Sequence, residues 1–193
     1  MTKPRACAEA FEELLKDSFQ AILGDRGTNY EPSTRAKSTA DLSFTDTYGN
    51  YCAVDIKTHC LGKWGMPNVI SYKKLAKFYS DTTNIFYVLL VEYEVSQGRI
   101  QVTKCTMVPI EHLSWECLAV QGTLGQIQIK NAEKVIIKPT DRTTWMSKFC
   151  SVSLSSIKTK ISSLHKEYAH FETLKSDWEN KLEVPRELIY NDI

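Results

Sequence analysis

An α+β domain with a mixed central β-sheet flanked by helices is the fold class that the sequence predicts. The expected elements follow one another in the order helix, strands, helix, strands, helix, which is typical of this class. The strands fall into two hairpins, one on each side of a central helix. A chain of 193 residues is long enough to bury one sizeable core. We therefore expect a single domain over residues 1–193, without internal repeats or low-complexity linkers.

The first half of the chain supplies a helix and the first hairpin. Apolar residues recur at helical spacing over residues 6–23, and a glycine follows that suits a helix end. Residues 25–35 are polar and contain a glycine and a proline, so we expect a loop there. Residues 38–45 and 51–59 flank the turn-rich segment 46–50, and this pattern predicts a β-hairpin.

A loop, a helix and the second hairpin come next. Glycine and proline mark residues 60–68 as a loop. Residues 69–79 predict a helix, and Asn68 is a favourable N-cap for it. An apolar, aromatic-rich strand is expected over residues 84–95, and a Ser-Gln-Gly turn connects it to a partner strand over residues 99–109.

The last third of the chain predicts strands and then a long helix. Residues 126–138 are suited to one or two further strands. Residues 141–182 are largely helical in pattern, with the serines at 151–156 as a candidate break.

Composition excludes several classes of protein. The apolar content is ordinary, which argues against a disordered chain, and no apolar run is long enough to span a bilayer. The first residues lack the apolar core of a signal peptide, so we expect a cytoplasmic protein. The six cysteines form no C-x-x-C pair, and we expect reduced, mostly buried thiols rather than a metal site.

The net charge of +1 argues only weakly against a nucleic-acid partner, because the distribution of charge matters more. Five lysines and no acidic residue lie between residues 56 and 80, whereas acidic residues gather near both ends of the chain. A positive surface in this region is expected, and the alternative is an ordinary solvated helix.

The stretch YCAVDIKTH, residues 51–59, places charged side chains in an otherwise apolar strand. Because side chains alternate along a strand, Asp55 and Lys57 lie on one face and Ile56 lies on the other. A spacing of two residues is about 6.6 Å, which lets both tips reach one phosphate or one metal-bound water. A carboxylate can bind a divalent cation, and a neighbouring lysine can position a water and offset phosphate charge.

The alternative for this pair is a structural ion pair at a sheet edge. An acid-x-lysine triplet is common by chance, and Glu179-Asn180-Lys181 repeats it in a polar, helical segment that we interpret as surface. The surroundings of each triplet must therefore separate a functional pair from a structural one.

A second acid supports the functional interpretation. If the turn of the first hairpin centres on Tyr48, residues whose numbers sum to 96 lie opposite each other, and Asp41 faces Asp55. Cross-strand partners have Cβ atoms about 4.5–5.5 Å apart, so the two carboxylates repel unless a cation lies between them. Mg²⁺ would relieve this repulsion. The alternative is that Asp41 only caps or solvates a strand end.

The order of an acid, thirteen residues, and then Asp55-Ile56-Lys57 in a strand–turn–strand context resembles the PD-(D/E)XK nuclease motif. Ala40 stands where the motif has its name-giving proline. Within that superfamily the chain resembles type II restriction endonucleases of the HincII and EcoRV group. The likeness is strongest between residues 39 and 76 and continues weakly over residues 84–94, 126–129 and 142–145.

The resemblance implies Mg²⁺-dependent hydrolysis of double-stranded DNA at a short palindromic site. It implies that Asp41 and Asp55 bind the metal with the main-chain carbonyl of Ile56, and that Lys57 positions or activates the attacking water. The implied products carry 5′-phosphates and 3′-hydroxyls, with blunt ends. A palindrome read twice implies a homodimer.

The loop after the lysine would read the DNA. Asn68 matches an asparagine that contacts bases in the resembled group, and asparagine suits adenine edges. Trp64 and Met66 are candidates to stack on bases or wedge between them, and simple packing is the alternative. The remaining candidates for DNA contact, in part to backbone phosphates, are Thr58, His59, Lys63 and Lys73.

Three alternatives stay open at this point. A repair or structure-specific nuclease would share the metal site without reading a palindrome. A non-catalytic DNA-binding protein would keep Asp55 and Lys57 as a structural pair. An interaction domain unrelated to DNA is the third.

Overall fold

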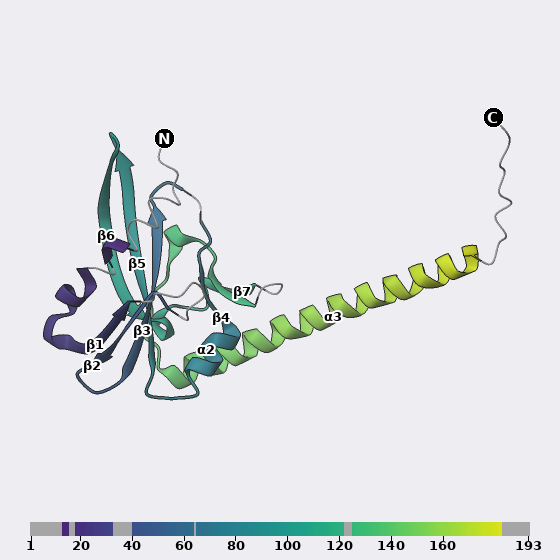
Figure 1. The fold of residues 1–193 in the computed structure, drawn as a ribbon, viewed down its shortest axis with the longest axis horizontal. Coiled ribbons are helices and arrows are strands. Elements are labelled where there is room, and N and C mark those ends of the chain that lie inside the picture. Colours follow the sequence, from purple (N-terminus) through teal and green to yellow (C-terminus); the bar gives the residue numbers. More distant parts are fainter. Residues whose placement is uncertain (1–12, 16–17, 33–39, 64, 122–124, 183–193) are drawn as a thin grey trace.

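A computed structural model describes residues 13–15, 18–32, 40–63, 65–121 and 125–182 of the chain. A body of two β-sheets carries one very long helix that leaves it at an angle (Figure 1). The predicted α+β class with a mixed central sheet is confirmed.

The central sheet has five strands in the order β1-β2-β3-β5-β6. Its strands β3 and β5 are parallel, and the other neighbours are antiparallel. The strands are β1 (Gly27–Pro32), β2 (Leu42–Asp46), β3 (Tyr51–Cys60), β5 (Ile85–Ser96) and β6 (Arg99–Pro109). Both predicted hairpins are therefore present, and the second one has the expected strands and turn.

A second, smaller sheet was not predicted. It is antiparallel, with the order β4-β8-β7, and consists of β4 (Asn68–Ser71), β8 (Gln126–Ile129) and β7 (Leu118–Gln121). The helices are α2 (Tyr72–Phe78) and α3 (Arg142–Leu182), and residues 13–15 and 18–23 are also helical. Short 3₁₀ turns occupy Gly24–Arg26, Ile110–His112 and Ala132–Lys134.

Each face of the central sheet covers a separate hydrophobic core, as the side-chain alternation predicts. On one face Val54 and Ile56 pack with Phe19 of the N-terminal helical segment. On the other face Ala53 and Phe86 pack with residues of the small sheet, α2 and the start of α3. Because Asp55 belongs to this second face, it lies where the two sheets approach each other.

Two predicted elements are wrong in part, for different reasons. Residues 27–32 form β1 rather than a loop, because they pair with β2 at the sheet edge and leave polar side chains in solvent. Residues 68–71 form β4 rather than the start of a helix. Their strand conformation depends on pairing with β8, which lies far away in the sequence.

Helix α3 is continuous across the serines, so the candidate break at 151–156 does not occur. Ser151 and Thr159 turn their hydroxyls back and donate to main-chain carbonyls one turn earlier, at 3.0 and 3.1 Å. Such bonds satisfy polar side chains without breaking the helix. No helix among the described residues is both long and apolar enough to cross a membrane.

The first turns of α3 are anchored to the body. Arg142 donates through Nε to the buried carboxylate of Glu111 at 2.5 Å and through Nη1 to the carbonyl of Thr82. Trp145 is buried, packs against the tilted ring of Trp115, stacks with Phe149, and donates to the Leu113 carbonyl at 2.9 Å. The segment Arg142–Trp145 is thus the attachment point of the helix.

The five cysteines in the described residues are all free thiols, as predicted. Cys52 and Cys117 are buried, Cys60 is half-buried, and Cys105 and Cys150 are exposed, so the expectation of mostly buried thiols is met only in part. Burial raises the pKa of the Cys52 thiol to about 11, which keeps it protonated and unreactive at neutral pH.

The turn of the first hairpin is held by Asp46. Its carboxylate accepts hydrogen bonds from the main-chain N–H groups of Tyr48 and Asn50 and from the Asn50 side chain, each at 2.9 Å. Partial burial works to raise the pKa of Asp46, but the bonds from Asn50 and Tyr48 outweigh it and hold the pKa below its ordinary value. The turn therefore fixes the register of the two strands.

We expect Asp46→Ala to lower the free energy of unfolding at pH 7 by about 1 kcal/mol, because these bonds are lost. A depressed pKa stabilises the fold above the unfolded-state pKa, and this contribution fades as pH falls through the folded-state value. The difference between variant and wild type should therefore shrink below about pH 4. Urea titrations at pH 7 and pH 3 measure it, with exposed Thr47→Ala as the control. An unchanged difference at pH 3 would contradict the assignment.

Candidate active site

The predicted register of the first hairpin is confirmed. Opposed residues run from Leu42 and Val54 to Thr45 and Tyr51, and every pair sums to 96. Carried one residue further, this register places Asp41 opposite Asp55.

Asp41 is fixed to β3 by two hydrogen bonds. Its main-chain N–H donates to the Val54 carbonyl at 2.9 Å, and its carboxylate Oδ2 accepts from the Ile56 N–H at 2.7 Å. These two partners flank Asp55 in the sequence. The carboxylate of Asp41 is thereby held beside the middle of β3.

Asp55 and Lys57 form a largely buried ion pair. Lys57 Nζ lies 2.9 Å from both carboxylate oxygens of Asp55. Asp55 is only 6% exposed, and the Lys57 side chain is 20% exposed. Burying a carboxylate is costly unless it is paired, so the lysine is part of what allows Asp55 to be ionised in this position.

Asp41 and Asp55 line a common cavity of about 190 Å³. Val69, Ile70 and Ser71 of β4 form one wall of the cavity, and Lys74 and Gln126 also line it. Asp55 lies in β3 and Asp41 directly precedes β2, and β4, β8 and α2 enclose the two acids.

Lys74, Ser71 and Gln126 are site residues that sequence reasoning missed. Gln126 is the first residue of β8 and follows Gly125, which has a positive φ of +64°. The Gly125 carbonyl accepts a hydrogen bond from the Tyr72 N–H, and this bond connects the start of β8 to the start of α2. The alternation Gln-Ile-Gln-Ile at 126–129 was the available signal, because it predicts a strand with its two glutamines on one face.

The donor set suits a hard divalent cation. Two carboxylates, a hydroxyl and an amide oxygen border one cavity, and Mg²⁺ prefers oxygen ligands while keeping several waters. Among the described residues no group of three or more histidine, cysteine, aspartate or glutamate side chains is placed to hold a metal. A cation here would therefore depend on Asp41, Asp55, main-chain oxygen and water.

The loop predicted to read DNA is described except for Trp64, which lies outside the described residues. Lys63 and Met66 are exposed, as such a role requires. Asn68 is exposed at the start of β4, and its Oδ1 accepts from Gln128 Nε2 at 3.1 Å. Gln128 also donates to the Met66 carbonyl at 2.9 Å, so β8 supports both residues.

Thr58 and His59 lie further along β3 and line a narrow cavity of about 20 Å³ together with Lys57. His59 is only 9% exposed, and its Nε2 lies 3.9 Å from Glu133 Oε1. The phosphate contact expected of His59 from the sequence therefore stays a prediction. Thr58 is half-buried.

The lysines of α2 are exposed, as a positive surface requires, but they do not all line the cavity of the two acids. Lys74 lines the cavity that holds Asp41 and Asp55, whereas Lys73, the residue predicted from the sequence, is not among the residues that line it. Among the exposed lysines of α2, Lys74 therefore adds positive charge beside the acids.

No protein-family model matches the chain, and no curated protein matches it either. Among solved structures, the chain can be superposed on the Holliday junction resolvase Hjc of the archaeal hyperthermophile Archaeoglobus fulgidus. That alignment covers 70% of this chain and 98% of the resolvase, with 13% sequence identity and a TM-score of 0.39. Function must therefore be inferred from the geometry of the site itself.

Proposed function

We propose that this chain is a nuclease that hydrolyses DNA phosphodiesters with a divalent metal bound between Asp41 and Asp55. The observation that carries the proposal is the convergence of Asp41, Asp55 and Lys57. Two carboxylates, one in β3 and one directly before β2, line one cavity, and the lysine lies within 3 Å of the more buried acid. The same three residues form the motif that resembles PD-(D/E)XK nucleases.

Asp41, Asp55 and the main-chain carbonyl of Ile56 would hold the metal, with Mg²⁺ as the expected ion. When bound, Mg²⁺ would lower the pKa of a coordinated water and stabilise the charge that develops on the phosphate.

Lys57 would contribute to the reaction through its ammonium group, which lies beside Asp55. Its ammonium group can donate a hydrogen bond to the attacking water and stabilise negative charge on a phosphate oxygen. The ion pair holds this ammonium group 2.9 Å from Asp55, which itself lines the cavity. Attack would be in line with the leaving oxygen, which gives 5′-phosphate and 3′-hydroxyl ends. Lys74 would add positive charge where the DNA backbone passes the cavity.

The finer proposal is a type II restriction endonuclease that cuts a short palindrome and leaves blunt ends. The loop that contains Lys63 and Met66, with Asn68 at its end, is placed next to the cavity-lining strand β4 and would read the bases. Gln128 supports this proposal, because its bond to Asn68 Oδ1 turns the Asn68 amide into an oriented donor. Two copies would be needed to read both halves of the palindrome.

The alternative is a structure-specific DNA nuclease. It would use the same acids and lysine but would recognise the shape of a branched or damaged duplex instead of a base sequence. The site does not favour one of these substrates over the other, because both present the same phosphodiester.

A substrate panel separates the two. The purified chain is incubated with Mg²⁺ and several plasmids, a phage genome, and a four-way DNA junction with its matched linear duplex. A restriction enzyme yields discrete, reproducible fragments from long duplexes and ignores the junction. A structure-specific nuclease cuts the junction and leaves the linear duplex intact. Cleavage of neither class would contradict the proposed function.

A further inference from the structure

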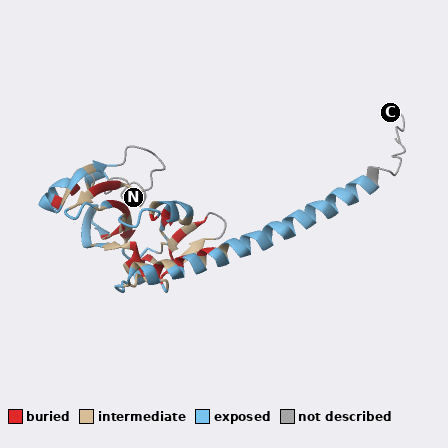
Figure 2. Cartoon of the chain, turned by 90° about the horizontal axis from the view of Figure 1, so that it is seen from below, coloured by how far each residue is buried: buried red, intermediate tan, exposed pale blue. Residues whose placement is uncertain are grey.

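Helix α3 continues far beyond the part that packs on the body (Figure 2). Every residue from 157 to 180 is exposed. The exposed side chains nevertheless include large apolar ones, which is unusual for a helix surrounded by water.

These apolar residues follow the heptad spacing of a coiled coil. Leu154, Ile157, Ile161 and Leu164 are separated by three, four and three residues. The same register continues through Tyr168, Phe171 and Trp178, and Lys175 takes the one remaining position. The seven apolar side chains are 36–65% exposed. A stripe of this kind over more than three heptads is the sequence signature of helix pairing.

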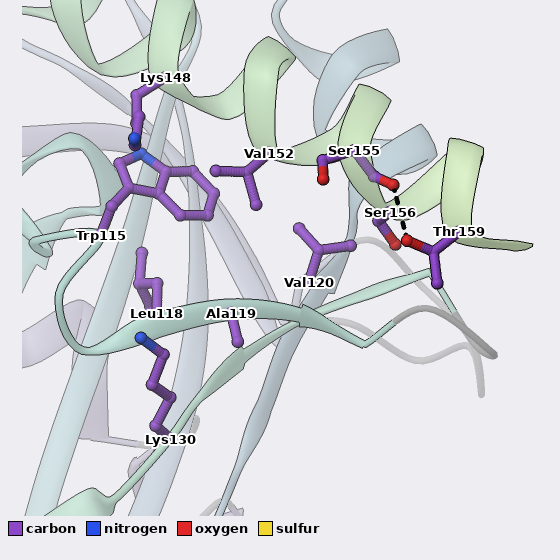
Figure 3. A pocket seen from close by; sticks show the side chains of 10 residues that line it. All are labelled: Trp115, Leu118, Ala119, Val120, Lys130, Lys148, Val152, Ser155, Ser156 and Thr159. Atoms are coloured by element: carbon purple, nitrogen blue, oxygen red, sulfur yellow. Dashed lines mark hydrogen bonds between the residues drawn. The ribbon is translucent and has the colours of Figure 1, made fainter.

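The stripe faces away from the body. A cavity of about 460 Å³ separates α3 from β7, and the helix lines it with Lys148, Val152, Ser155, Ser156 and Thr159. Figure 3 shows these side chains on the side of the helix that faces Trp115 and β7. When Leu154 is assigned to heptad position a, the stripe occupies positions a and d. The residues that line the cavity then occupy positions b, c and f, on the opposite side of the helix. A second helix can therefore lie along the stripe without meeting the body.

Charge is divided between the two halves of α3. Residues 142–166 contain five basic residues and no acidic one, whereas residues 167–182 contain four acidic residues and two lysines. Side-chain size is divided at the same point. The stripe is aliphatic up to Leu164 and aromatic from Tyr168 onward, except for Lys175.

We propose that α3 pairs with α3 of a second copy of this chain as an antiparallel two-stranded coiled coil centred near residue 166. Antiparallel pairing brings the basic half of each helix against the acidic half of the other. It also places each aliphatic side chain of one copy across from the C-terminal half of the stripe in the other. The layers are Leu154 with Trp178, Ile161 with Phe171, and Leu164 with Tyr168, while Ile157 covers the stem of Lys175.

A parallel pair fits the sequence less well. In a parallel pair, Tyr168, Phe171 and Trp178 would each meet the same residue of the other copy. These aromatic layers would lie next to layers of smaller aliphatic residues, so the layers would differ widely in volume. A parallel pair would also place Glu167 beside Glu172 of the other copy twice. In the antiparallel pair, Lys158 of each copy instead lies beside Glu172 of the other copy. One like-charged pair remains, between the two copies of Glu167 near the two-fold axis of the dimer.

The pair has a consequence for the position of the two bodies. Each helix leaves its body near residue 153, which lies across from residue 179 of the other copy. The attachment points are therefore about 40 Å apart along the coil, because a helix rises 1.5 Å per residue. A palindrome of six base pairs spans about 20 Å. The coil thus separates the two attachment points by about twice the length of such a site.

The oligomeric state of the full chain tests the proposal without any assay of cleavage. Sedimentation equilibrium of the wild type should give twice the monomer mass of 22.0 kDa at micromolar concentration. Leu164→Glu should raise the dissociation constant at least about a hundredfold, because both copies lose a core layer. Ser163→Glu, on the neighbouring c position, should leave it unchanged. A monomeric wild type, or equal effects of the two variants, would overturn the proposal.

The orientation is tested with charges. Glu172→Lys should weaken an antiparallel dimer about tenfold, because it places one lysine beside the Lys158 of each copy, and adding Lys158→Glu should restore the affinity. In a parallel dimer, Glu172→Lys would instead face Glu167 and tighten the pair. Tightening would overturn the antiparallel arrangement. Because the readout is mass and not cleavage, a failure here is distinct from a failure of the nuclease proposal.

Discussion

Lys57→Ala is expected to lower the rate of DNA cleavage by at least about a thousandfold while DNA binding persists. The lysine is the cation nearest the buried acid, and removing one preorganised donor from a transition state typically costs two to three orders of magnitude. Loss of the positive charge beside Asp55 adds to this. Cleavage rates under single-turnover conditions with Mg²⁺ measure the effect. Lys104→Ala, at an exposed lysine of β6, is the matched control and should cleave like the wild type.

The same substitution has a structural effect that must be separated from the chemical one. Without Lys57, the carboxylate of Asp55 stays buried and loses its ion pair, which should destabilise the fold by about 3 kcal/mol. The double variant Asp55→Asn with Lys57→Met removes both charges and should recover most of that stability. If it also recovered cleavage, or if Lys57→Ala cut DNA at the wild-type rate, the two residues would be only a structural pair.

Trp145→Ala is expected to lower the free energy of unfolding by about 3–5 kcal/mol. The indole is almost fully buried, with its ring centroid 4.9 Å from that of Trp115 and 5.8 Å from that of Phe149. Its N–H also donates to the Leu113 carbonyl. The substitution therefore opens a cavity and leaves a buried carbonyl without its donor at the base of α3. Denaturant titrations followed by circular dichroism measure the loss.

Trp145→Phe divides this effect into its parts. Phenylalanine keeps most of the ring contacts and loses the hydrogen bond, so we expect a smaller loss of about 1–2 kcal/mol. Lys166→Ala, at an exposed position of the same helix outside the apolar stripe, controls for changing a residue of α3 and should leave the stability of the body unchanged. A loss below about 1 kcal/mol for Trp145→Ala would contradict its role as the anchor of the helix.

Local sequence signals predicted the parts of the fold that local contacts determine. The register of the first hairpin follows from the turn at Asp46, and the alternation in β3 separates Asp55 from Val54 and Ile56. For this reason the juxtaposition of Asp41 and Asp55 could be predicted before any coordinates were known.

Pairings between segments that are distant in the sequence could not be predicted. Val69 and Ile70 fit one face of a helix equally well, and only the pairing with β8 makes them a strand. The same pairing brings Gln126 into the cavity and Gln128 to Asn68, so the second wall of the site was missed with it. The burial of His59 could not be predicted either, because its place near the lysine in the sequence does not determine how exposed its ring is.

Conversion of supercoiled plasmid to nicked and linear forms tests the central claim most directly. The wild type with Mg²⁺ should cleave the plasmid, and EDTA, Asp55→Asn or Lys57→Ala should each abolish cleavage, while Lys104→Ala should leave it intact. If the folded wild type failed to cleave any of several plasmids with Mg²⁺ or Mn²⁺, Asp41, Asp55 and Lys57 would not form a nuclease site. Their buried contacts would then serve only to hold β3 in place.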